Sequence, residues 1–369
     1  MAKPGARNLI TDVPGIQVGQ AEDAAVRTGV SVIVPDAPAI AAVAVSGGGP
    51  GTRETDLLSA GMLVDGIDAV CLSGGSAFGL AAADGVASGL KLEGRGFALM
   101  PLTGVPRTPI VPAAILYDLA NGGDKNWGET SPYAALGLTA YRARSREVAL
   151  GRAGAGYGAR AGAHDGGTGS ASIVTQDGIT VGALAGVNCF GSVFMPGTEA
   201  YWAWPHEIGG EFGGERPPEN YAADAEDWGA AKANPAMGQN TTIACIATDV
   251  ILTASEAKRV AQMALSGFSR AIRPVFAPFD GDAVFVMSSG RIADPEAQPS
   301  RPSSARPRPA PVSDLRSAPA RRPPPAASGP RQTNYPYTSY NLLDERGLGV
   351  LGTPARGGEG GSGAPPCNK

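Results

Sequence analysis

The feature that most constrains the fold is a succession of short β-branched runs bounded by glycine and proline, with helical segments between them. Strands are predicted at 29–34, 40–46, 69–72, 111–120, 173–175 and 179–187. Helices are predicted at about 78–90, at 133–146 and after residue 253. The order is not a strict alternation of strand and helix. We therefore predict an α+β fold in which two packed sheets carry helices on their outer faces.

The clearest helix follows residue 253. Thr253 and Glu256 have the spacing of a capping box at its start. Apolar residues then recur on one helical face, at Ala257, Val260, Ala261, Ala264, Leu265 and Phe268. Beyond this helix, the runs 275–277 and 283–286 flank Asp280-Gly281-Asp282. Because Asp-Gly is typical of tight hairpin turns, we predict a β-hairpin here.

The composition changes at about residue 295. The segment that follows is rich in proline and arginine and poor in large apolar residues. Such a segment cannot bury enough apolar surface to offset its loss of conformational entropy. We expect one folded domain over residues 1–294 and a disordered tail over 295–369.

Composition also narrows the partners. The formal net charge is −4, which gives no electrostatic argument for nucleic-acid binding. No basic region followed by an apolar run opens the sequence, and no stretch of 18 apolar residues occurs. We expect a cytoplasmic protein without a membrane or nucleic-acid partner.

The cysteines and histidines limit the chemistry. The four cysteines lie far apart without a CxxC pair, so neither a zinc site nor a disulfide framework is predicted. Cys71 and Cys245 lie in apolar runs, which predicts buried thiols. His164 and His206 are the two histidines, and neither has a recognisable partner motif for nucleophilic catalysis nearby. The sequence favours a mechanism without histidine, and we expect no metal and no cofactor.

A possible nucleophile lies in the run Gly238-Gln239-Asn240-Thr241-Thr242-Ile243-Ala244. A threonine follows an asparagine and precedes an apolar, strand-like segment. Its hydroxyl can attack the carbonyl of Asn240, and release of the peptide leaves Thr241 as a new N-terminus. An α-amine, with an ordinary pKa of about 8, can then serve as the base for its own hydroxyl. Most such triplets are turn-to-strand junctions, so the triplet alone does not decide.

Three glycine-rich loops, at 47–51, 73–79 and 154–162, leave several functions open. None has the full spacing of a dinucleotide-binding motif or of a P-loop. Their backbone amides can form an oxyanion hole, or the glycines can serve tight packing.

Four other residues have both an ordinary and a catalytic interpretation. Asp280 and Asp282 fit a turn, but beside an N-terminal threonine they could orient its amine and hydroxyl. Asn188 ends a strand and is either a cap or a donor to a developing oxyanion. Tyr117 is flanked by apolar residues and fits a core tyrosine.

Together these segments resemble the L-aminopeptidase/D-esterase (DmpA-like) peptidase family, which includes β-aminopeptidases and the nylon-oligomer (6-aminohexanoate-oligomer) endohydrolase. The motifs that carry the resemblance occur in the family's order over about residues 8–292. They are Ile10-Thr11-Asp12-Val13-Pro14-Gly15-Ile16-Gln17-Val18-Gly19, Gly49-Pro50-Gly51-Thr52-Arg53-Glu54-Thr55-Asp56-Leu57-Leu58, Leu72-Ser73-Gly74-Gly75-Ser76-Ala77-Phe78-Gly79-Leu80, Val187-Asn188-Cys189-Phe190-Gly191, Asn240-Thr241-Thr242-Ile243 and Asp280-Gly281-Asp282.

The resemblance implies an αββα sandwich, layered like the N-terminal-nucleophile (Ntn) hydrolases. It also implies self-cleavage into two chains that stay together, usually as tetramers. By match to the motifs, Thr241 is the nucleophile and Asn188 the oxyanion donor. Asp280 and Asp282 match the pair that positions the nucleophile in the nylon-oligomer branch, and Tyr117 matches a tyrosine of that site.

The sequence departs from the family at two places. The nylon-oligomer branch also uses a lysine in the glycine-rich stretch, but Gly162-Ala163-His164-Asp165 offers none. The family normally ends with an apolar helix soon after the Asp-Gly-Asp motif, and here the Pro/Arg-rich tail stands in its place. We interpret this as a reading-frame change near 296–301, which sequencing of the gene would test.

The sequence thus predicts a cofactor-independent amide hydrolase that cuts itself between Asn240 and Thr241. Its substrates would be short peptides, β-peptides or amide oligomers, and we expect a homo-oligomer of cleaved heterodimers. One alternative is an acyltransferase on the same self-cleaving scaffold, and another is a non-enzymatic glycine-rich binding module.

Overall fold

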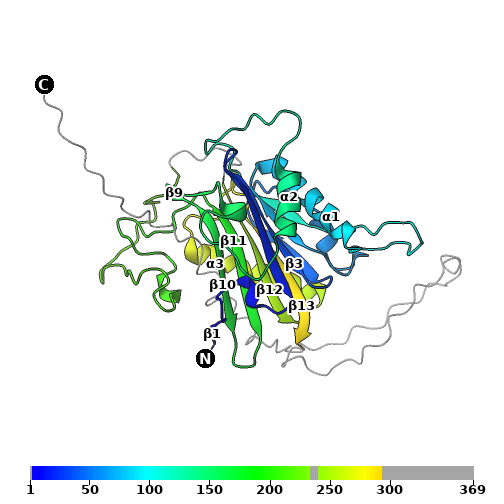
Figure 1. The fold of residues 1–369 in the computed structure, drawn as a ribbon. Coiled ribbons are helices and arrows are strands. Elements are labelled where there is room, and N and C mark those ends of the chain that lie inside the picture. Colours follow the sequence, from blue (N-terminus) through cyan, green and yellow to red (C-terminus); the bar gives the residue numbers. More distant parts are fainter. Residues whose placement is uncertain (1, 233–239, 293–369) are drawn as a thin grey trace, which may run out of the picture.

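The computed structural model describes residues 2–232 and 240–292, and these form two large sheets with helices outside (Figure 1). The tail predicted from residue 295 and the proposed frame change lie outside the described residues. The six-stranded sheet has the order β1 (Lys3–Pro4), β10 (Gly167–Val174), β11 (Thr180–Asn188), β12 (Thr241–Val250), β13 (Ala283–Ile292) and β4 (Ile40–Val45). The five-stranded sheet has the order β2 (Ile16–Asp23), β3 (Thr28–Pro35), β6 (Val70–Ser73), β7 (Ala113–Ile115) and β5 (Thr52–Arg53).

The remaining elements are short or lie outside the sheets. β8 (Arg160–Ala161) and β9 (His164–Asp165) form a small separate ribbon. The helices are α1 (Ala82–Leu92), α2 (Tyr133–Arg142) and α3 (Ala254–Ala271), with short 3-10 turns at Ile10–Asp12, Asp56–Leu58, Ser76–Ala81, Gly154–Gly156 and Trp204–His206. No helix in the described part of the chain is long and apolar enough to cross a membrane.

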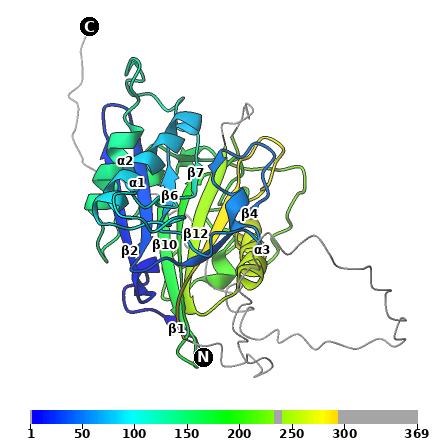
Figure 2. The ribbon, with the colours of Figure 1, turned by 90° about the vertical axis from the view of Figure 1, so that its right-hand side faces the viewer.

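The elements stack in four layers, helices, sheet, sheet and helix (Figure 2). Between the two sheets lies a buried cluster that includes Leu72 of β6 and Phe285 of β13. A second cluster joins the other face of the five-stranded sheet to α1 and α2, and a third joins the six-stranded sheet to α3. The predicted αββα arrangement is therefore confirmed.

β12 shows why the six-stranded sheet occupies an inner layer. All of its residues are buried, and successive side chains alternate between two cores. Ile243 and Cys245 face the cluster between the sheets, whereas Ala244 and Ile246 face α3. Burial on both faces explains the continuous apolar run in the sequence.

α3 connects β12 to β13, which pair in parallel. Thr253 caps the helix as predicted: its hydroxyl accepts the Glu256 N–H at 3.2 Å, and Glu256 Oε2 accepts the Thr253 N–H at 2.7 Å. The helix buries the predicted face, including Val260 and Phe268.

The predicted hairpin around Asp280-Gly281-Asp282 is wrong. Residues 275–277 form no strand, and β13 pairs instead with β12 and β4. The Phe276 N–H donates to Asp282 Oδ2 at 3.2 Å and the Ala277 N–H to Asp280 Oδ2 at 3.0 Å. Because the two aspartates take these N–H groups, the run 275–277 cannot use them in a ladder.

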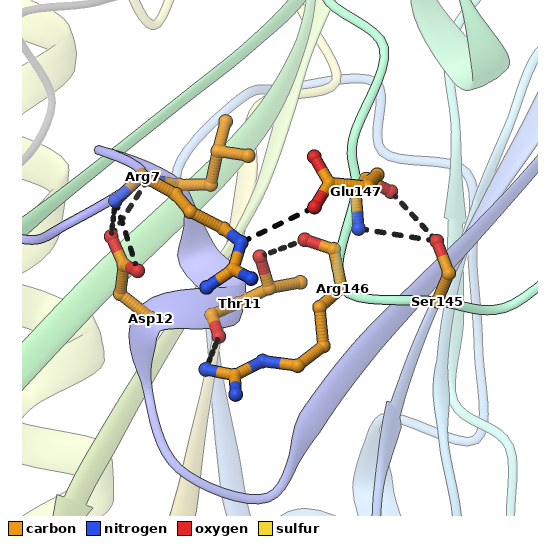
Figure 3. A network of polar contacts seen from close by, with 7 residues as sticks. Arg7, Thr11, Asp12, Ser145, Arg146 and Glu147 are labelled. Carbon is orange, nitrogen blue, oxygen red and sulfur yellow. Dashed lines mark hydrogen bonds and ion pairs between the residues drawn. The ribbon is translucent and has the colours of Figure 1, made fainter.

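The first family-like motif has a structural role at its start (Figure 3). Thr11 Oγ1 donates to the Arg146 carbonyl at 2.6 Å, and the Arg146 guanidinium donates back to the Thr11 carbonyl at 3.0 Å. Arg7 adds an ion pair with Glu147 at 3.3 Å. These contacts fasten the N-terminal segment to the loop that follows α2.

Candidate active site

Thr241 is the first residue of β12 and is 3% exposed. Its hydroxyl donates to the carbonyl oxygen of Asn240, the residue before it. The same carbonyl accepts the Gly281 N–H at 3.0 Å. The carbonyl at the predicted cleavage site is therefore buried, held by a backbone donor and in contact with the predicted nucleophile.

Asp282 supports the start of β12 from the adjacent loop. Its Oδ1 accepts the Thr242 N–H at 2.6 Å, so the carboxylate fixes the residue after Thr241. Burial, and then the negative charge of Asp280, raise the pKa of Asp282 to about 7. This carboxyl group can therefore exchange a proton near neutral pH.

Asp280 lies beside the predicted cleavage site and pairs with Asn240 in an isolated parallel bridge. Its Oδ1 is buried and has no hydrogen-bond partner among the described residues. Burial raises its pKa, and the positive charge of Lys232 opposes that rise. In this uncut chain the Thr241 hydroxyl contacts Asn240 rather than either aspartate.

The first glycine loop lies along this same segment. The Gly49 N–H donates to the Asp280 carbonyl at 2.7 Å and the Gly47 N–H to the Asp282 carbonyl at 3.3 Å. A Cβ on Gly47 would lie 2.2 Å from the Asp280 carbonyl oxygen, so only glycine permits this approach. The loop packs backbone against backbone along residues 280–282.

Asn188 ends β11 directly opposite Thr241 in the antiparallel register. Its Oδ1 accepts the Arg160 N–H at 2.9 Å, and its Nδ2 donates to the Tyr117 carbonyl at 2.9 Å. The amide thus joins two loops that approach the site.

A cavity of about 330 Å³ lies next to Asn188. Tyr117 and Asn188, both predicted site residues, lie in its wall, together with Asp118, Ala120, Asn121, Gly158, Arg160, Gly162, Ala163 and Lys232. Thr241, Asp280 and Asp282 are not among the lining residues.

Lys232 is one of the site residues that the sequence analysis missed. Its Nζ donates to the Asn188 carbonyl at 3.1 Å. Burial lowers the pKa of Lys232 to about 8, although the negative charge of Asp280 opposes this shift. Lys232 places a cation at this site, although the glycine-rich stretch contains no lysine. Because it lies in no recognisable motif, the sequence gives no signal for it.

Asp118 is a buried acid in the wall of this cavity. Thr28 Oγ1 donates to its Oδ2 at 2.6 Å, and the Gly75 N–H donates to its Oδ1 at 2.7 Å. Burial raises the pKa of Asp118 against these donors and the charge of Lys125. The glycine loop 73–79 therefore orients a carboxylate at this site.

Other chemistries find little support in the described part of the chain. No cluster of three or more His, Cys, Asp or Glu side chains there could hold a metal ion. The His164 ring makes an edge-to-face contact with Phe194, with ring centroids 4.9 Å apart, and does not line the 330 Å³ cavity. Cys71 and Cys245 are buried free thiols, as their apolar runs predict.

Solved structures show which class of protein has this fold. A β-aminopeptidase of Burkholderia sp. superposes with a TM-score of 0.58 at 22% identity, over 95% of this chain and 87% of that chain. The L-aminopeptidase D-Ala-esterase/amidase of Ochrobactrum anthropi, described as a variant of the Ntn hydrolase fold, gives 0.56 at 19% identity, over 95% and 86%. The fold is that of the Ntn-type aminopeptidases.

Sequence relatives define the family. The profile of peptidase family S58 matches residues 8–318, and the chain belongs to that family. An uncharacterized aminopeptidase of Mycobacterium tuberculosis is 42% identical over 296 residues, which are 78% of this chain and 83% of the relative. A 6-aminohexanoate-oligomer endohydrolase of Agromyces sp. is 31% identical over 302 residues, 78% and 77% of the two chains. The protein is thus a peptidase or amidohydrolase, and the predicted resemblance is confirmed.

Proposed function

We propose that this peptidase is made as a precursor that cuts itself between Asn240 and Thr241 and then uses Thr241 as an N-terminal nucleophile. The observation that carries the proposal is the contact between the Thr241 hydroxyl and the Asn240 carbonyl oxygen, which also accepts the Gly281 N–H. A hydroxyl in contact with a polarised, buried carbonyl is arranged for intramolecular attack.

Maturation then proceeds by an acyl shift. Thr241 Oγ bonds to the carbonyl carbon of Asn240, the C–N bond breaks, and the departing nitrogen takes a proton. Water hydrolyses the resulting ester and restores the hydroxyl. The products are a chain of residues 1–240 and a chain that begins at Thr241. In this proposal the hydrolase domain covers residues 1–294, and the segment 295–369 lies outside it as a tail.

In the mature enzyme the freed α-amine of Thr241 accepts the proton of its own hydroxyl during attack on the substrate. Asp280 and Asp282 orient the amine and the first residues of β12, and the contact of Asp282 with Thr242 supports this role. Asn188, opposite Thr241, donates to the oxyanion of the substrate. Tyr117 contributes to the wall against which the substrate lies.

The proposed substrates are short peptides, β-peptides or linear amide oligomers. The cavity of about 330 Å³ is at the small end of ligand pockets, which favours a few residues at a time. Lys232 and Arg160 place positive charge in its wall, and Asp118 places negative charge there. Such a wall suits a substrate that carries both an ammonium and a carboxylate. We also propose a cytoplasmic homo-oligomer of cleaved heterodimers, for which native mass spectrometry measures the assembly.

Intact mass and N-terminal sequencing of the purified protein test the proposal. We expect a second chain that begins Thr-Thr-Ile-Ala. Thr241→Ala should give one uncut, inactive chain, and Thr241→Ser, which keeps a hydroxyl, should still be cut. A Thr241→Ala protein that is cut and active would refute the assignment. Transfer of the acyl group to an added amine in preference to water would favour the acyltransferase.

A further inference from the structure

A relay of two backbone hydrogen bonds ends at the carbonyl of the proposed cleavage site. The Gly49 N–H donates to the Asp280 carbonyl at 2.7 Å, and the Gly281 N–H donates to the Asn240 carbonyl at 3.0 Å. The Asp280 carbonyl and the Gly281 N–H belong to one planar peptide group. Gly49 therefore fixes the orientation of the donor that contacts Asn240.

We propose that this relay is the oxyanion hole for self-cleavage, with Gly281 as the direct donor and Gly49 as its positioning residue. The inference rests on the proposed self-cleavage and adds the group that stabilises its transition state. As Thr241 Oγ bonds to the carbonyl carbon, the carbonyl electron pair moves to the Asn240 oxygen. A fixed N–H at that oxygen stabilises the new charge without reorganisation.

The hydrogen bonds of the uncut chain show why the Asn240 oxygen needs a donor besides the Thr241 hydroxyl. In the uncut chain the Asn240 oxygen accepts both the Thr241 hydroxyl and the Gly281 N–H. The hydroxyl gives up its proton when it attacks, so its hydrogen bond is lost as charge develops. The Gly281 N–H remains. Because Gly49 polarises the same peptide group from its other side, the remaining bond is strengthened cooperatively.

The glycines of both segments fit this role sterically. A Cβ on Gly281 would lie 2.7 Å from Thr241 Oγ1, so glycine leaves room for the nucleophile. A Cβ on Gly48 would lie 2.2 Å from the Pro278 carbonyl oxygen. The two backbones can lie this close only without side chains, which gives the glycine run a function beyond a turn.

Gly49 offers a matched pair of variants. A Cβ there would have only ordinary contacts, the nearest at 3.7 Å. Gly49→Ala keeps the N–H, whereas Gly49→Pro adds a similar Cβ and removes the N–H. We would follow cleavage by pulse-labelled cell-free translation and separation of the chains on denaturing gels. We expect Gly49→Pro to cleave about tenfold more slowly than Gly49→Ala.

Thermal unfolding shows whether each variant folds. If Gly49→Pro does not fold, variants of Gly281 provide a second matched pair. Gly281→Ala and Gly281→Pro both crowd the Thr241 hydroxyl, but only proline removes the direct donor. Gly281→Pro should therefore cleave itself about 10²–10³-fold more slowly than Gly281→Ala. Equal rates within both pairs would overturn the relay while leaving self-cleavage intact. An uncut wild-type chain would overturn both.

Discussion

Asp282 is the carboxyl group for which the structure predicts the largest effect of pH on stability. It is 1% exposed. Burial first, and the charge of Asp280 second, raise its pKa from the ordinary 3.8 to about 7. The N–H groups of Thr242 and Phe276 donate to its two oxygens but do not offset the desolvation.

The sign of the effect follows from proton linkage. Because the folded-state pKa lies above the unfolded one, the folded chain holds the proton more tightly between about pH 4 and pH 7. The stability that this proton contributes is complete below pH 4 and is lost as the pH rises toward 7. At about 1.36 kcal/mol per pH unit, the loss reaches at most about 4 kcal/mol. Asp282→Asn removes the titration and with it this loss.

Urea unfolding at several values between pH 4 and pH 8 measures the effect. The parent should be Thr241→Ala, so that the chain stays uncut. Asn cannot accept both N–H groups, which costs about 0.5–1.5 kcal/mol at every pH. The informative quantity is therefore the difference between parent and Asp282→Asn, which should move in favour of the variant as the pH rises. Asp177→Asn, an exposed loop control, should follow the parent. Parallel curves for parent and Asp282→Asn would refute the reasoning.

Three further changes have defined outcomes. Lys232→Met should lower kcat/KM about 10–100-fold by removing a cation from the cavity. Because the pKa of Lys232 is about 8, activity that needs its charge should fall above pH 8 in the wild type but not in Lys232→Arg, and a pH-rate profile measures this. Phe268→Ala should lower the unfolding free energy by about 3–5 kcal/mol, since the ring is fully buried on the inner face of α3. Phe78→Ala, which removes a half-exposed ring, should change it far less in the same urea titration. Thr253→Ala should cost about 0.5–2 kcal/mol by removing the cap of α3, and a melting curve measures it.

The layers of the fold were predictable because several strands appear in the sequence as short β-branched runs, and the helix after residue 253 has a clear apolar face. The limits of the elements were not. Residues 111–120 predict one strand, but β7 covers only Ala113–Ile115. The Leu116 N–H still donates to the Ser73 carbonyl, and the chain then turns away toward the cavity. Similarly, β10 begins inside the glycine-rich stretch, where composition gave no strand signal.

In the candidate site, too, one part was predictable from the sequence and another was not. The motifs identify residues that the register brings together, as with Asn188 and Thr241. They do not reveal which hydrogen bonds those residues make. The amide of Asn188 is engaged by Tyr117 and Arg160, and the Gly281 N–H contacts the Asn240 carbonyl. Such contacts depend on the tertiary approach of loops, which local sequence does not encode.

The order of the six-stranded sheet gives a reason why a cut before Thr241 need not separate the products. β12 and β13 lie after the proposed cut, whereas their outer neighbours, β11 and β4, lie before it. Both pairings are antiparallel ladders over several residues. In addition, α3, which belongs to the second chain, packs against β4 of the first chain. Separation would therefore break two ladders and expose buried surface on both faces of the sheet. We expect the two chains to co-elute in native buffer and to part only in denaturant. Two chains that separate without denaturant would show that these ladders do not hold the cleaved protein together.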